Sequence, residues 1–216
     1  MKILNLYAGI GGNRKLWTPS GNEHEITAVE NKPEIAKIYA DFFPNDKVIV
    51  ADAHEYLLKH FEEFDFIWSS PPCPTHSRFN LLNNAPFKEN RNIKYPDMGL
   101  YQEIIHLKHW FKGKWCVENV ISYYDPLIPP TESNSHYFWT NFLIPSFPNQ
   151  VRKIKRTNEN DILREEIIGI DLSKYDLPTR FRRTLINNCV EPQTGKRILE
   201  YAINPIETQA SLNFAP

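Results

Sequence analysis

Two groups of residues in the first part of the chain have types and spacing suited to binding a nucleoside. The glycine turn, residues 9–12, follows one short apolar run, and Glu30 ends the next. Glycines let a backbone approach a ligand closely, and a carboxylate at a second strand end can accept both hydroxyls of an adenosine ribose. The turn lacks the third, widely spaced glycine of a pyrophosphate site. We therefore expect a cofactor without a diphosphate, which S-adenosyl-L-methionine fits better than NAD.

Asp52 is a further candidate, at the end of the third apolar run. Its carboxylate could accept a hydrogen bond from the adenine amino group or cap the helix that follows, and the cap needs one oxygen. The two roles are compatible. Glu30 also has a second interpretation, as a solvated glutamate near a helix start, and the sequence leaves this alternative open.

Short β-type runs alternate with segments of helical spacing over the first half of the chain. The predicted strands span residues 2–7, 26–29, 48–50, 64–68 and 115–120, and the predicted helices span residues 33–43, 52–61 and 104–111. This alternation predicts an α/β fold with a doubly wound, mostly parallel sheet covered by helices on both faces. The polar, asparagine-rich tract 71–95 is predicted to be a long loop.

Reactive residue types follow the last two predicted strands. Cys73 lies in a proline-rich turn after the fourth strand, and Glu118 and Asn119 close the fifth. With the glycine turn, Glu30 and Asp52, five consecutive strand ends carry glycine, polar or reactive residues. Because a doubly wound sheet binds ligands at the carboxyl ends of its strands, this pattern predicts a cofactor cleft beside a reactive site.

Four segments, taken together in this order, resemble the motifs of cytosine-5 DNA methyltransferases. They are similar to the family's phenylalanine-glycine cofactor motif, its Pro-Cys motif, its Glu-Asn-Val motif and, more loosely, its Gly-Asn-Ala-Val-Pro-Pro motif. Residues 2–120 carry the resemblance well, and residues 180–202 less closely. The segments are Leu6-Tyr7-Ala8-Gly9-Ile10-Gly11-Gly12, Ser69-Ser70-Pro71-Pro72-Cys73-Pro74-Thr75-His76-Ser77, Val117-Glu118-Asn119-Val120 and Leu185-Ile186-Asn187-Asn188-Cys189-Val190-Glu191-Pro192.

The resemblance implies methyl transfer from S-adenosyl-L-methionine to carbon 5 of a cytosine flipped out of the duplex. Cys73, with a lowered pKa, would add to carbon 6, and Glu118 would protonate or hydrogen-bond ring nitrogen 3. Asn119 belongs to the same motif and is expected in the catalytic site. The expected cofactor-binding residues are Tyr7, Ala8, Gly9, Ile10, Gly11, Gly12, Glu30, Asn31, Asp52, Ala53, Pro71, Asn188 and Val190.

The chain departs from the family pattern where two arginines of a Gln-x-Arg-x-Arg motif are expected, because Asn134 and His136 stand in their place. Three alternatives follow: His136, when protonated, takes over part of the role of the arginines, or Arg78 substitutes for them, or the activity is weak. His136 could also be only a half-exposed strand residue. These alternatives stay open, with His136 and Arg78 as candidate catalytic residues.

The recognition region is the second departure. Residues 1–144 and 181–216 would form the catalytic domain, which leaves residues 145–180 as a short target-recognition insert where the family commonly has a separate domain. Each good base contact contributes about 1–3 kcal/mol of discrimination, and a short insert makes few of them. We therefore expect a short or relaxed recognition sequence.

Two basic runs are expected to contact phosphates in a chain whose formal net charge is only −1. A solvated, charge-rich loop is the alternative for these runs. The expected partner is double-stranded DNA, and RNA stays open because transfer-RNA methyltransferases share the same motifs. The basic residues are Arg152, Lys153, Lys155, Arg156, Arg180, Arg182 and Arg183.

Two other functions compete with this interpretation. Methyltransferases of exocyclic amino groups carry Asp/Asn/Ser-Pro-Pro-aromatic, but Cys73 cannot stack on a base as the aromatic residue would. A degenerate methyltransferase fold that binds the cofactor or DNA and regulates another process is also open. The altered arginine motif favours it, and the intact Cys73, Glu118 and Asn119 oppose it.

The remaining expectations come from composition and analogy. Three scattered cysteines predict neither a zinc site nor a disulfide framework, and the chain shows no signal peptide or long apolar run, which indicates a cytoplasmic protein without a membrane segment. The compact form is similar to methyltransferases of bacteriophages and mobile elements, which often protect DNA from restriction. We expect a monomer, because the duplex must enter an open cleft.

Overall fold

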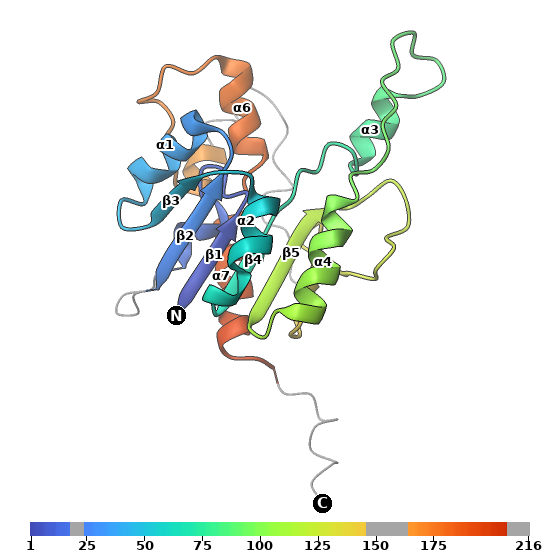
Figure 1. Cartoon of the computed structure of the whole chain (residues 1–216). Coiled ribbons are helices and arrows are strands. Elements are labelled where there is room, and N and C mark those ends of the chain that lie inside the picture. The colour runs from blue at the N-terminus through green and yellow to red at the C-terminus, as the bar shows by residue number, and fades with distance from the viewer. Residues whose placement is uncertain (18–23, 146–163, 207–216) are drawn as a thin grey trace, which may run out of the picture.

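The computed structural model describes residues 1–17, 24–145 and 164–206, and these form an α/β fold on one seven-stranded sheet (Figure 1). The strand order is β3-β2-β1-β4-β5-β7-β6, in which the first five strands are parallel and β7 pairs antiparallel with both β5 and β6. The predicted doubly wound, mostly parallel sheet is confirmed. The strands are β1 (Lys2–Leu6), β2 (Glu25–Glu30), β3 (Lys47–Val50), β4 (Phe66–Ser69), β5 (Lys114–Val120), β6 (Thr131–Ser133) and β7 (His136–Thr140).

Helices cover both faces of the sheet because successive strand residues point to opposite sides. Leu4 of β1 packs in a cluster with Leu57 and Ile104 of α2 and α4, whereas Ile3 packs in another with Ile198 of α7. Figure 1 shows α2 and α4 in front of the sheet and α7 behind it. Among the described helices, none is long and apolar enough to span a bilayer. The helices are η1 (Asn13–Leu16), α1 (Pro33–Phe42), α2 (Ala53–His60), η2 (Phe61–Glu63), α3 (Arg78–Asn83), α4 (Gly99–Trp110), α6 (Thr179–Asn187) and α7 (Pro192–Ile203).

The register of the sheet aligns the ends of four strands. Leu6 of β1 pairs with Val29 of β2 and with Ser69 of β4, and Ser69 pairs with Val117 of β5. Strand order reverses between β1 and β4, which is where doubly wound sheets bind ligands. The residues that come next in the four strands therefore share one edge of the sheet, and they are Tyr7, Glu30, Ser70 and Glu118.

Helix α3 lies within the tract that the sequence predicts to be loop, so that part of the prediction is wrong. The Ser77 side chain caps the helix by accepting a hydrogen bond from the Phe79 amide at 3.2 Å. No residue of α3 is buried. Without a buried face the helix leaves no hydrophobic periodicity in the sequence, which explains why pattern reasoning missed it.

The described part of the predicted insert packs on the catalytic core. After a helical turn at residues 164–168, Ile170 and Leu172 are buried in a cluster with Ile35 of α1 and Leu185 of α6. The division at residues 145 and 180 stays a prediction. The buried cluster shows that residues 168–172 contribute to the same core as the catalytic segments.

Candidate active site

A cleft of about 370 Å³ opens at the carboxyl edge of the parallel strands. Its size falls in the range of small-molecule binding sites. It brings together most of the residues that the sequence predicts for cofactor binding and catalysis. Those that line it are Tyr7, Ala8, Gly9, Ile10, Gly12, Glu30, Asn31, Pro71, Cys73, Glu118, Asn119, His136, Asn188 and Val190.

The glycine turn needs its glycines for backbone shape and for packing. Gly9 and Gly11 have φ angles of 54° and 84°, in the left-handed region that favours glycine. A Cβ on Gly11 would also lie 2.3 Å from the Phe43 ring, so this glycine packs against α1 and does not line the cleft. Tyr7 has a φ of 55° as well, which is strained for a residue with a side chain.

Gly12 allows the C-terminal segment to close one side of the cleft. A Cβ on Gly12 would lie 2.6 Å from the Val190 carbonyl oxygen and 2.8 Å from Cβ of Cys189. This close approach brings Asn188 and Val190 to the cleft, although they are far from Gly12 in the sequence. The structure thus places the C-terminal motif beside the glycine turn, as the sequence analysis predicts.

The Glu30 carboxylate is buried and held in one orientation by the backbone. The Gly9 amide donates to Oε2 at 3.1 Å and the Lys32 amide donates to Oε1 at 3.0 Å, and the residue is 8% exposed. Each carboxylate oxygen keeps a second lone pair for a ligand. A fixed acceptor pair in the cleft fits the ribose of S-adenosyl-L-methionine, and it is not the solvated glutamate of the alternative interpretation.

Asp52 and Ala53 do not line the cleft. The Asp52 side chain accepts a hydrogen bond from the Glu55 amide at 3.0 Å and so caps α2, which confirms the capping role. The adenine contact of Asp52 stays a prediction.

The proline-rich turn that carries Cys73 is tied to β5. The Asn119 side-chain amide donates to the Pro71 carbonyl at 3.0 Å, and both groups are buried. Its oxygen accepts a hydrogen bond from the Val120 amide, also at 3.0 Å. The Cys73 carbonyl in turn accepts from the amides of His76 and Ser77. Asn119 therefore links the turn that carries Cys73 to the end of β5.

The pKa of the Cys73 thiol is raised to about 11, first because the group is buried and second because the charge of Glu118 lies close to it. The expectation of a lowered pKa is wrong. Cys73 and Glu118 lie in the same cleft, and the negative charge of the carboxylate disfavours ionisation of the thiol. A positive charge in the cleft, or a hydrogen bond donated to the sulfur, would lower the pKa of Cys73.

His136 lies beside Glu118 in the cleft. Its Nε2 atom is 3.7 Å from Oε1 of Glu118, which is 6% exposed. Its Nδ1 atom is 3.0 Å from the Asn134 carbonyl oxygen, a partner that can only accept, so Nδ1 carries the hydrogen. Of the two proposed substitutes for the missing arginines, the structure brings His136 into the cleft beside Glu118.

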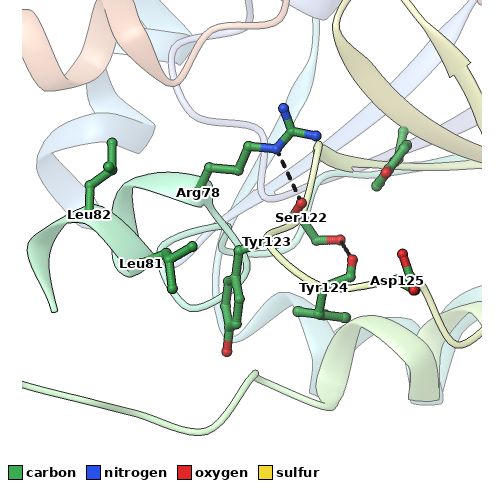
Figure 2. A pocket seen from close by; sticks show the side chains of 8 residues that line it. Arg78, Leu81, Leu82, Ser122, Tyr123, Tyr124 and Asp125 are labelled. Carbon is green, nitrogen blue, oxygen red and sulfur yellow. Dashed lines mark hydrogen bonds between the residues drawn. The ribbon is translucent and has the colours of Figure 1, made fainter. Parts of the chain in front are cut away.

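Arg78 is not brought into this cleft. It lies at the start of α3 and lines a separate pocket of about 410 Å³ with Tyr123 and Tyr124 (Figure 2). Its Nε atom donates to the Ser122 carbonyl at 3.4 Å. The segments that carry Cys73 and Glu118 continue into this second pocket.

The predicted phosphate contacts are only partly covered by the structure. Arg152, Lys153, Lys155 and Arg156 lie outside the described residues. Arg182 makes a two-pronged ion pair with Glu165, at 2.5 and 2.6 Å, so its charge is matched within the protein. Arg180 is exposed on α6, and Arg183 of the same helix is half-buried.

Ten further residues line the cleft that the sequence analysis did not name as site residues. Seven of them lie inside the four quoted motif segments, so the motifs themselves located them, and the other three follow the glycine turn or lie at the start of α1. They are Asn13, Lys32, Ile35, Ser70, Pro72, Pro74, Val120, Leu185, Asn187 and Cys189.

The doubly wound sheet brings a glycine turn, a carboxylate suited to a ribose and a cysteine to one edge. This combination is typical of transferases that use a nucleoside cofactor. The family model described as C-5 cytosine-specific DNA methylase matches residues 1–121, more than half of the chain. The chain belongs to the C-5 cytosine-specific DNA methylase family. The cofactor of this family is S-adenosyl-L-methionine.

Two solved structures illustrate the similarity. DNMT2 from Spodoptera frugiperda is 26% identical, with a TM-score of 0.38, and the match covers 55% of this chain and 35% of that one. A SAM-dependent methyltransferase from Agrobacterium tumefaciens is 13% identical, with a TM-score of 0.41, over 57% of this chain and 40% of that one. This chain therefore spans less than half the length of either protein. A comparison with curated proteins found no match.

Proposed function

We propose that the protein transfers a methyl group from S-adenosyl-L-methionine to carbon 5 of cytosine in double-stranded DNA, through a covalent bond to Cys73. One observation carries this proposal: a single cleft is lined by the glycine turn and Glu30 and also by Cys73 and Glu118. A cofactor and a reacting base can therefore meet there. Membership of the C-5 cytosine-specific DNA methylase family supports the reaction.

The residues expected to bind the cofactor line the part of the cleft around the glycine turn and Glu30. Glu30 would accept the ribose hydroxyls, and residues 7–10 and Gly12 with Asn188 and Val190 would enclose the rest. When bound, S-adenosyl-L-methionine supplies an electrophilic methyl group on a positively charged sulfur.

The part of the cleft around Cys73 and Glu118 has the groups that would activate the cytosine. Cys73 would add through its thiolate sulfur to carbon 6, and the displaced electron pair of the carbon 5–carbon 6 double bond makes carbon 5 nucleophilic. Glu118 would stabilise this addition by giving a proton or hydrogen bond to ring nitrogen 3. Carbon 5 then takes the methyl group, a base removes the proton from carbon 5, and Cys73 leaves with the sulfur–carbon electron pair.

Two local features oppose the other functions. The residue after Pro72 is a cysteine, which cannot stack on a base as the aromatic residue of an amino methyltransferase would. The buried bond from Asn119 to the Pro71 carbonyl supports a fixed position for the cysteine turn, as a covalent reaction at Cys73 needs. RNA is the second candidate substrate, because the same motifs serve transfer-RNA methyltransferases.

The test is transfer of labelled methyl from S-adenosyl-L-methionine to duplex DNA and, separately, to transfer RNA. We expect label in DNA with the wild type and none with Cys73→Ala. Label in RNA alone would reassign the substrate, and transfer that persists without Cys73 would refute the covalent route. Bisulfite sequencing of the methylated DNA is expected to show a short or relaxed site, and a defined site of six base pairs would contradict this.

A further inference from the structure

Glu103 is a buried carboxylate that does not line the cleft. It stands on α4, and its side chain is 0% exposed. Tyr7 donates its hydroxyl proton to Oε1 at 2.6 Å, and Ser69 donates to Oε2 at 2.5 Å. Burying a carboxylate costs free energy unless hydrogen-bond donors surround it, so the bonds from Tyr7 and Ser69 are needed to stabilise Glu103 in the interior.

The two hydroxyl groups belong to different halves of the site. Tyr7 is the first residue after β1 and begins the cofactor turn, with the strained φ of 55°. Ser69 is the last residue of β4, and the turn that carries Cys73 follows it directly. One carboxylate is thus bonded to the base of the cofactor turn and to the base of the cysteine turn.

A third donor fixes the carboxylate from the side of α2. The His54 Nδ1 atom lies 3.0 Å from Oε1 of Glu103. The hydrogen bond to Glu103 and the nearby carboxylates raise the pKa of His54. With Tyr7, Ser69 and His54 around it, the side chain has donors from three elements and little freedom to move.

We propose that Glu103 is a positioning residue that holds the cofactor turn and the cysteine turn in a single relative arrangement. It does so through Tyr7 on one carboxylate oxygen and Ser69 on the other. The inference rests on the proposed methyl transfer for its functional consequence, since it sets where Cys73 stands relative to the cofactor. Its structural content, two turns ordered by one side chain, is independent of the reaction.

The first test is hydrogen exchange of backbone amides in the free protein. Tyr7→Phe removes one hydroxyl and is expected to speed exchange about tenfold in residues 8–11 only. Ser69→Ala is expected to do the same in residues 73–77 only. Glu103→Gln keeps the size of the side chain but loses an acceptor, and it is expected to speed exchange in both segments.

Tyr56→Phe is the matched control, because Tyr56 lies on α2, where its ring stacks on His60. It is expected to leave both segments unchanged. Exchange that rises equally throughout the chain, β3 included, in Glu103→Gln would show a merely structural role and overturn the proposal. Unchanged exchange in both segments would also overturn it. If Glu103→Gln does not fold, the two single hydroxyl variants still decide.

The second test separates binding from chemistry. Tyr7→Phe is expected to raise the Kd for S-adenosyl-L-homocysteine about tenfold, and Ser69→Ala to lower kcat about tenfold while the Kd changes less than twofold. Glu103→Gln is expected to do both. If the exchange pattern appears but the wild type transfers no methyl group, the proposed function fails and the positioning role stands. If the wild type transfers methyl and the variants match it, the positioning role fails.

Discussion

Asn119→Ala is expected to lower methyl transfer strongly, although Asn119 touches the cysteine turn only through the backbone. The residue is 2% exposed and bridges two backbone groups. Its amide donates to the Pro71 carbonyl and its oxygen accepts from the Val120 amide, each at 3.0 Å. Alanine removes both bonds and leaves a buried carbonyl at the base of the Cys73 turn without its partner.

The size of the effect follows from these two bonds. A typical hydrogen bond contributes about 1 kcal/mol net, and a buried group left unpaired costs about 1–3 kcal/mol. We therefore expect the free energy of unfolding to fall by about 2–3 kcal/mol. If the loosened Cys73 turn must be reordered during the reaction at a cost of about 1–3 kcal/mol, kcat falls roughly 5- to 160-fold, because each 1.36 kcal/mol is tenfold in rate.

Asn141 offers a matched control at the opposite end of β5. Its side chain also bridges two backbone groups, donating to the Gly113 carbonyl at 2.9 Å and accepting from the Trp115 amide at 3.1 Å. Asn141→Ala is expected to lower stability in urea unfolding while kcat of the folded protein stays within twofold of the wild type. Equal kcat values for the wild type and Asn119→Ala would refute the reasoning.

Three further predictions follow from the site. Gly12→Ala should lower Tm and weaken cofactor binding, because its Cβ would lie 2.6 Å from the Val190 carbonyl oxygen and overpacking costs about 1–3 kcal/mol; calorimetry showing wild-type values would contradict this. Alkylation of Cys73 by iodoacetamide should rise as pH approaches about 11, and in Glu118→Gln this rise should move to lower pH because a negative charge is lost; identical profiles by peptide mass spectrometry would count against it. Neutralising the basic residues of the segment 152–156 should weaken DNA binding and flatten its salt dependence, and an unchanged salt titration would remove that segment from the interface.

The positions of Glu30 and the glycine turn at the cleft could be predicted from the sequence because they depend on local order along the chain. Glu30 and the glycine turn each follow a buried run, and parallel pairing then puts all strand ends at one edge. Asp52 caps its helix as its residue type predicts. These features need only periodicity, turn chemistry and the rules of sheet topology.

The remaining features depend on contacts that local pattern does not contain. The raised pKa of Cys73 comes from its burial and from the charge of Glu118 on another strand. Glu103 gave no sequence signal, because a glutamate on a helix is usually solvated and its three donors come from separate elements. Arg78 illustrates the converse, since proximity to Cys73 in sequence did not bring it into the cleft.

Family membership and fold leave one question at the centre of the account, which is whether Cys73 bonds to the base. The most direct measurement uses a DNA duplex in which 5-fluorocytosine replaces cytosine, with S-adenosyl-L-methionine present. After addition and methylation, carbon 5 carries fluorine and has no proton to lose, so the elimination that frees the cysteine is blocked.

We predict a protein–DNA adduct that survives denaturation and that peptide mass spectrometry places on Cys73. Cys189→Ala should form the adduct as the wild type does, because the pKa of the half-buried Cys189 thiol is raised to about 12, although the residue lines the cleft. Cys73→Ala should form none. Methyl transfer to ordinary cytosine without any adduct on the fluorinated duplex, or an adduct that persists in Cys73→Ala, would contradict the account.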